Sequence, residues 1–318
     1  MTEDLAPGRR TSLLAVAAEL VVETTAAEVV DALERDGVRS ILLKGPSFAR
    51  WLYGPNATRP SVDVDLLISP GDRAAAEGTV TRLGFAPFPS NVPAEDERRH
   101  AYCWDRDAGL IGVDLHFTLP GVAVSDEDAW CALTGATERL TVGGREIEVL
   151  APASRALHVA IHAAQHGPGF EGPMADLERA LEQIRPELWE EAAALARRLE
   201  AVPMFAAGLG LQPKGRWIAR GLRVDDERTV EAALRASTPP DLALGFERLA
   251  SRPGLWPKVE FAIRKLVPPR AWMLSCVPLA RRGRLGLVAA YLWRPLWLLR
   301  RVGPALRAWR RARRQAAG

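Results

Sequence analysis

Two aspartates that alternate along one short apolar segment, Asp63 and Asp65 in SVDVDLLI (61–68), have the types and spacing for chemistry. Successive side chains of a strand point to opposite faces, so both carboxylates project from the same face, with alpha carbons about 6.6 Å apart. Two carboxylates held at this spacing repel each other, and a bound divalent cation relieves the repulsion. The pattern therefore indicates an Mg²⁺ site. The alternative is a strand face that is simply wetted.

A Gly-Pro-Ser turn precedes this strand. RSILLKG (39–45) is predicted to be a buried strand that ends in glycine, and PSFARWLYG (46–54) a helix that begins with proline. Free backbone amides at a helix N-terminus attract phosphate. The turn therefore predicts an anion site beside the acidic strand.

A third carboxylate, Asp114, lies in GVDLH (112–116), where alternation places His116 on the same face. The surrounding segment, 100–119, contains two strand-like runs around Asp107-Ala108-Gly109, which predicts a hairpin. His116 either lines the site with Asp114 or orients a carboxylate through a hydrogen bond.

The elements that must position these residues form a mixed α/β region followed by a helical one. The predicted elements are helices over 13–35 and 69–84, strands over 39–45, 62–68 and 145–152, and helices over 153–166, 174–184 and 187–200. We therefore expect an α/β domain over residues 1–150. A helical domain over 151–318 is expected to shape the acceptor pocket.

The composition of the chain bears on the size of its core, on disulfides and on its location in the cell. A chain of 318 residues with 48% hydrophobic residues can bury one large or two medium cores. Cys103, Cys131 and Cys276 are widely spaced, which argues against a disulfide or zinc framework and favours packing roles in a reducing compartment. The first residues do not resemble a secretory signal. A cytoplasmic location is expected.

A set of motifs in a fixed order resembles the uncharacterised nucleotidyltransferase family of the DNA polymerase beta-like superfamily. The motifs are ILLKGPSFARWLYG, RPSVDVDLLI, GVDLHFTL and LHVAIHAAQH. The resemblance covers residues 35–180 and only loosely the helical tail. It implies a small mixed sheet flanked by helices. It also implies Mg²⁺-dependent transfer of a nucleoside monophosphate from a nucleoside triphosphate, such as ATP, to an acceptor, with release of pyrophosphate.

The same resemblance implies roles for individual residues. Gly45 and Ser47 would hold the phosphates. Asp63, Asp65 and Asp114 would bind one or two Mg²⁺ ions, with Asp114 also helping to deprotonate the attacking hydroxyl. The proline between the glycine and the serine, and the long gap to the first aspartate, depart from the wider superfamily, although the gap suits this family.

The roles of two basic residues near these motifs can each be interpreted in two ways. Lys44 either pairs with a triphosphate or is an ordinary lysine at the end of a strand. Arg59 either binds phosphate or balances the acidic cluster. Together with His116, both are treated as candidate nucleotide-binding residues.

Three histidines, His158, His162 and His166, recur every four residues and form one stripe on a predicted helix. Zinc is an alternative, but no H-E-x-x-H pattern is present, and neighbours on one straight helix rarely complete a tetrahedral site. We expect a structural or site-lining role, with Asp176 as a partner.

A basic segment ends the chain. The formal net charge is +3, but none of the 39 acidic residues lies after Glu260, whereas fourteen of the 42 Lys and Arg residues do. Residues 1–260 therefore carry a formal charge of −11. Tryptophans lie among these arginines, namely Trp272, Trp293, Trp297 and Trp309. Such a segment is a solvated helical surface by default, and otherwise contacts an anionic membrane or a nucleic acid.

The acceptor is expected to be a small molecule or a peptide or protein, because no nucleic-acid-binding module is recognisable. Two other functions remain open. One is a nucleotide-binding or interaction protein that keeps the fold without turnover. The other is a peripheral membrane protein that uses the basic segment.

Overall fold

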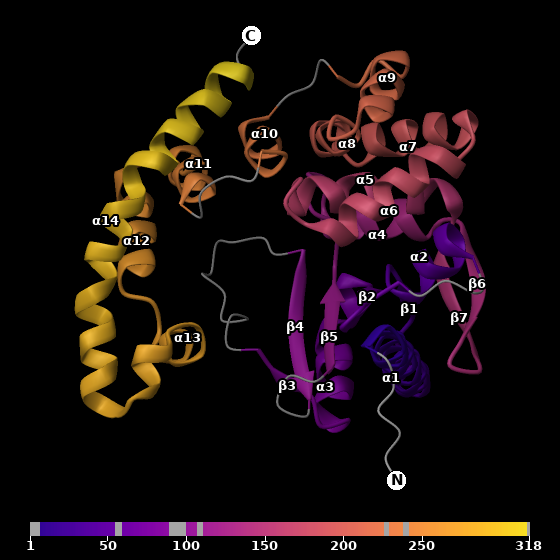
Figure 1. Cartoon of the computed structure of the whole chain (residues 1–318), viewed down its shortest axis with the longest axis horizontal. Coiled ribbons are helices and arrows are strands. Elements are labelled where there is room, and N and C mark those ends of the chain that lie inside the picture. The colour runs from indigo at the N-terminus through magenta and orange to yellow at the C-terminus, as the bar shows by residue number, and fades with distance from the viewer. Residues whose placement is uncertain are drawn as a thin grey trace.

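The computed structural model describes residues 7–54, 59–88, 100–106, 111–225, 229–237 and 242–316. Within them the strands form one seven-stranded mixed sheet with the order β3-β4-β5-β2-β1-β7-β6 (Figure 1). The strands are β1 (Ser40–Leu42), β2 (Asp63–Ile68), β3 (Ala86–Pro87), β4 (Ala101–Arg106), β5 (Ile111–His116), β6 (Thr137–Val142) and β7 (Arg145–Leu150).

Helices cover the sheet and make up the rest of the chain. Those of the first half are α1 (Pro7–Arg35), α2 (Pro46–Phe48) with a π-helix (Ala49–Tyr53), a 3₁₀ turn (Pro70–Asp72), α3 (Arg73–Arg82) and α4 (Asp126–Thr134). Those of the second half are α5 (Pro152–His166), α6 (Glu171–Gln183), α7 (Pro186–Arg198), α8 (Val202–Leu209), α9 (Pro213–Gly221), α10 (Val230–Arg235), α11 (Ala243–Ser251), α12 (Leu255–Leu266), α13 (Arg270–Cys276), a 3₁₀ turn (Pro278–Arg281) and α14 (Gly283–Ala316). The expected α/β fold with a mainly helical second half is confirmed.

The strand β2 occupies the middle of the sheet. It pairs antiparallel with β1 and parallel with β5. Both of its faces are covered, because alternate residues enter two different hydrophobic clusters. Val64 and Leu66 pack with Leu33 of α1, while Leu67 packs with Leu157 of α5. A central strand with both faces covered holds its side chains in fixed positions.

One of these clusters continues across the predicted domain boundary. Leu43 of the sheet region, Leu150 at the end of β7, Leu157 of α5 and Phe205 of α8 belong to the same cluster. The helices α5 to α8 therefore complete the core of the sheet. The division into 1–150 and 151–318 stays a prediction.

The last helices pack through smaller clusters. In one of them, Leu234 and Ala243 lie against Ala305 and Ala312 of α14. Figure 1 shows α14 running along the outer edge of the molecule, at the left of the view, with α11 and α12 beside it. Across the part of the chain described, none of the helices has both the length and the hydropathy needed to cross a bilayer.

Several predicted boundaries differ from the structure. The first helix begins at Pro7 rather than at residue 13, and the segment 46–54 is one short α-helix followed by a π-helix. The antiparallel pairing of β4 with β5 is confirmed, although the predicted turn, Asp107-Ala108-Gly109, lies outside the described residues. The strand β6, which pairs with β7 at the edge of the sheet, was not among the predicted elements.

Candidate active site

The register of the central strands brings the candidate acids together. Asp65 of β2 lies directly opposite Asp114 of β5, and Leu67 lies opposite His116. Because these pairs share a face with Asp63, the acids and the histidine project toward the side covered by α5. Ligand atoms of Asp65, Asp114 and His116 lie within 4.8 Å of one another. The sheet thus assembles a compact group of two carboxylates and an imidazole.

A lysine lies against the two aspartates of β2. The Nζ atom of Lys44 is 3.0 Å from Oδ2 of Asp65 and 3.6 Å from Oδ2 of Asp63. Burial alone would lower the pKa of Lys44, but the charges of Asp65 and Asp63 outweigh it and raise the pKa above its usual value. Lys44 is therefore an ammonium that neutralises part of the acidic cluster.

The three carboxyl groups have different environments. Burial and the charge of Asp65 raise the pKa of Asp63 to about 6. Burial and the same charge also raise the pKa of Asp114. Asp65 is buried as well, but Lys44 and the hydrogen bond from His116 lower its pKa below the usual range. Asp65 is therefore the carboxylate of the group that stays ionised. The positive charge near Asp63 and Asp114 is too small to offset the effect of burial on their pKa values.

The imidazole of His116 fixes the orientation of Asp65. Its Nε2 atom lies 2.9 Å from Oδ1 of Asp65, with both side chains buried. His116 thus hydrogen-bonds Asp65 and also lies in one group with Asp114, so both interpretations of its role stay predictions. The ring of His100 also contacts His116, with 5.7 Å between ring centroids.

Cys103 is a neighbour of the site that sequence reasoning treated as a packing residue. It lies opposite Asp114 in the antiparallel pairing of β4 with β5. Burial and the hydrogen bond to Asp114 raise the pKa of the Cys103 thiol, so the thiol stays protonated and donates to the carboxylate. The predicted hairpin brought residue 103 close to residue 114, but its turn at 107–109 would have placed residue 103 opposite residue 113, whereas the structure pairs it with Asp114.

The Gly-Pro-Ser turn adopts a tight conformation at the end of β1. Gly45 has a φ of +63°, a backbone region that glycine enters without strain, and a Cβ there would lie 3.3 Å from Oγ of Ser61. Ser47 is fully buried, and its Oγ has no hydrogen-bond partner among the described residues. The phosphate-holding roles of Gly45 and Ser47 stay predictions.

Arg59 forms a buried ion pair with Asp176. Its Nε lies 2.8 Å from Oδ1 of Asp176 and its Nη2 lies 2.6 Å from Oδ2, while the hydroxyl of Tyr53 donates to Oδ1 at 2.8 Å. Arg59 thus balances an acid, as one interpretation held, but the acid belongs to α6 rather than to the strand. Asp176 accepts hydrogen bonds from Arg59 and Tyr53 rather than from the histidine stripe, where a partnership had been expected.

The histidine stripe of α5 forms a row of tilted and edge-on ring contacts. His158 contacts Phe48, with 5.3 Å between ring centroids, and the row continues through His162 and His166 to Phe170. Burial lowers the pKa of His158 to about 3 and that of His162 well below its usual value. Both rings are neutral packing elements. The metal-capable group found among the described residues includes none of the three stripe histidines.

The family model described as "Uncharacterised nucleotidyltransferase" matches residues 9–214, a range that contains every candidate site residue. This chain belongs to that family. Membership supports nucleotidyl transfer as the activity, with a nucleoside triphosphate as one substrate. The family match ends before α10, so the basic helix α14 lies outside it.

Two further comparisons concern solved structures and curated proteins. The solved solution structure of the antibiotic-resistance factor ANT(2'')-Ia is similar to this member of the family, with 16% sequence identity and a TM-score of 0.41. The similarity covers 57% of this chain and 95% of that chain. No curated protein matches the chain in sequence.

The donor set of this family member fits a divalent metal. Carboxylate oxygens are the ligands that Mg²⁺ prefers, and Asp65 and Asp114 present theirs opposite each other on parallel strands. Burial and the charge of Asp65 raise the pKa values of Asp63 and Asp114, and a bound cation would stabilise both carboxylates in their charged form. The oxygen ligands of the site therefore fit a metal ion. Lys44 supplies part of the positive charge that neutralises them.

A cleft adjoins this group. It has a volume of about 1160 Å³, and its lining includes His100, Thr118, Arg235 and Lys265. His100 connects it to the site through its contact with His116.

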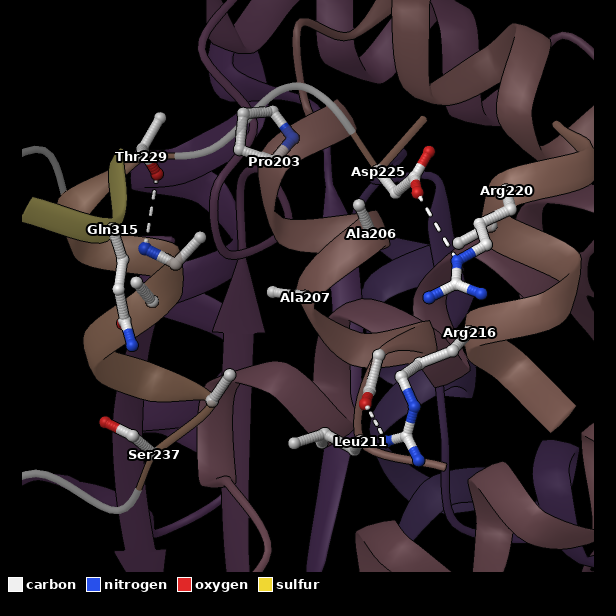
Figure 2. A pocket seen from close by; sticks show the side chains of 15 residues that line it. Pro203, Ala206, Ala207, Leu211, Arg216, Arg220, Asp225, Thr229, Ser237 and Gln315 are labelled. Atoms are coloured by element: carbon white, nitrogen blue, oxygen red, sulfur yellow. Dashed lines mark hydrogen bonds and ion pairs between the residues drawn. The ribbon is translucent and has the colours of Figure 1, made fainter. Parts of the chain in front are cut away.

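A second, smaller pocket of about 560 Å³ lies among α8, α9 and α10. Figure 2 shows that Arg216 and Arg220 at its wall point to partners within the protein, with Nη1 of Arg216 3.0 Å from the carbonyl oxygen of Gly210. Its lining does not include the acidic group.

Proposed function

We propose that this protein is a Mg²⁺-dependent nucleotidyltransferase that transfers a nucleoside monophosphate from a nucleoside triphosphate to a small-molecule, peptide or protein acceptor. The observation that supports this activity most directly is the opposition of Asp65 and Asp114 on parallel strands at the centre of the sheet. These residues lie in the part of the chain that matches the nucleotidyltransferase family.

In this proposal Asp63, Asp65 and Asp114 hold the metal. When bound there, Mg²⁺ would polarise the phosphoryl oxygens and lower the pKa of the attacking hydroxyl. His116 keeps the Asp65 carboxylate in one orientation through its hydrogen bond. The ammonium of Lys44 pairs with Asp63 and Asp65. We propose that it pairs with the triphosphate instead once the metal neutralises these carboxylates.

Asp114 is the proposed proton acceptor. Its carboxylate lies directly opposite Asp65 on the neighbouring parallel strand, so it would be close to a hydroxyl that attacks beside the metal. Cys103 holds the same carboxylate by donating its thiol hydrogen. Asp114 therefore has a fixed position beside the proposed metal site.

The acceptor is proposed to enter through the cleft that contains His100. The wall of this cleft carries basic side chains from the helices beyond α9, including Arg235 and Lys265, and acidic ones, including Glu231. Mixed charges suit a polar acceptor. The second half of the chain would then contribute to acceptor choice, while the sheet provides the chemistry.

The test is transfer of label from each alpha-labelled nucleoside triphosphate with Mg²⁺ in an extract of host cells, together with pyrophosphate release. Wild type is compared with Asp63→Asn/Asp65→Asn, and with Glu190→Gln/Glu191→Gln as a matched control that removes two exposed acids from α7. Label on an extract component with wild type and the control, but not with the site variant, supports the proposal.

If wild type binds Mg²⁺ and nucleotide but labels nothing and releases no pyrophosphate, the non-catalytic nucleotide-binding function replaces the proposed one. Far-ultraviolet circular dichroism of each variant verifies that it is folded.

A further inference from the structure

Helix α14 carries an apolar stripe on the side turned away from its packing partners. Its packed side is defined by small buried residues, Gly286, Ala290, Ala305 and Ala312. At 100° per residue, the stripe lies on the opposite side of the helix. Its members, with their exposed fractions, are Leu285 (86%), Val288 (56%), Leu292 (71%), Leu296 (53%) and Leu299 (70%).

Arginines continue the same side of the helix beyond this stripe. Arg307, Arg310 and Arg314 follow at helical spacing and are exposed. Arg300 flanks the stripe and lies over the ring of Trp293, 5.3 Å from its centroid. One side of α14 thus presents a row of leucines and a valine followed by a row of cations.

A second helix of this region also exposes apolar side chains. The neighbouring helix α12 exposes Leu255, Trp256 and Ile263 by 79%, 75% and 54%. The sequence contains no acid after Glu260, although residues 1–260 carry a formal charge of −11. An apolar row with cations on the same side and no acids in its segment is complementary to a surface that is anionic outside and apolar beneath.

We propose that α14 docks this protein on an anionic lipid bilayer, lying in the plane of the membrane. The apolar stripe enters the boundary between headgroups and acyl chains, and the arginines contact lipid phosphates. From residue 285 to residue 299 the stripe extends for about 21 Å. The same arginines on a nucleic acid would leave five exposed aliphatic side chains without a role.

The docking test uses the full chain and sedimentation with vesicles of phosphatidylcholine alone or with 30% phosphatidylserine. Wild type is expected to bind the anionic vesicles, less tightly as salt rises, and to bind neutral vesicles weakly. Leu292→Ser/Leu296→Ser/Leu299→Ser should abolish binding to both. Arg307→Gln/Arg310→Gln/Arg314→Gln should weaken binding to anionic vesicles about a hundredfold.

The matched control is Arg185→Gln/Arg198→Gln/Lys214→Gln, which removes three exposed positive charges on α7, on α9 and at the N-cap of α7. This control should bind like wild type. Equal losses for the control and the α14 arginine variant would overturn the proposal, since they would show a general charge effect. Absence of wild-type binding to anionic vesicles would also overturn it, and salt-dependent binding of short RNA by the same protein would then assign the surface to nucleic acid.

Discussion

Lys44 and Asp65 form a nearly buried ion pair at the centre of the sheet, with 3.0 Å between Nζ and Oδ2. The ammonium occupies the neighbourhood in which a metal ion would act, and it also reaches Asp63 at 3.6 Å. Lys44 therefore supplies part of the positive charge that stabilises these carboxylates.

Lys44→Met is expected to lower the free energy of unfolding in EDTA by about 3 kcal/mol, because removal of one partner leaves buried carboxylates uncompensated. Mg²⁺ should restore stability to this variant more strongly than it stabilises wild type. Urea unfolding with EDTA and with Mg²⁺ measures both effects, and Lys214→Met, at an exposed position, is the control. Equal Mg²⁺ stabilisation of Lys44→Met and wild type would contradict the metal assignment.

His116→Phe should reduce metal affinity about 10–100-fold, because the hydrogen bond that orients Asp65 is lost. His116→Gln, which can still donate a hydrogen bond, should lose less. Isothermal titration with Mn²⁺ separates the two variants. An unchanged affinity in both would show that the orientation of Asp65 does not depend on His116.

Arg59→Met should destabilise the protein by about 3–5 kcal/mol, since it leaves Asp176 buried without its bidentate partner. The double variant Arg59→Met/Asp176→Leu should recover most of this loss, because it removes the isolated charge as well. Urea denaturation of wild type, the two single variants and the double variant gives the interaction energy through a double-mutant cycle. A single variant as stable as wild type would show that the pair adds nothing.

His158 makes stability depend on pH. Its pKa is about 3 in the folded protein against an ordinary value of 6.5, so between these values the unfolded chain binds more protons. The free energy of unfolding should therefore fall as pH decreases below 6.5, by up to about 1.4 kcal/mol per pH unit from this residue. His158→Phe should show a shallower decline between pH 6 and pH 4, measured by urea denaturation. His166→Phe, at a half-buried position, should change the slope less.

Local sequence patterns were enough to predict which residues lie on the same face of one strand or one helix. The alternation of Asp63 and Asp65 and the run around Asp114 predicted strands with acids on one face, and the structure places these strands side by side. The register that sets Asp65 opposite Asp114 was beyond such reasoning, because alternation fixes the face of a strand but not its partner.

The partners that lie far apart in the sequence were the ones missed. The pairing of Arg59 with Asp176 spans 117 residues, and no local spacing encodes it. The strand β6 is different, since Gly143-Gly144 between two alternating segments was a usable hairpin signal. The exposed stripe of α14 required the packed side to be known first, because leucines at helical spacing usually indicate a core face.

The central position of β2 has a kinetic consequence. Amide hydrogens in a strand that is flanked by two other strands and covered on both faces exchange with solvent only when the whole cooperative unit opens, whereas helices that pack through small clusters exchange through local opening. We expect residues 64–67 to be among the slowest to take up deuterium and α14 among the fastest. The strand β2 would then retain its order while local opening exposes the amides of the C-terminal helix.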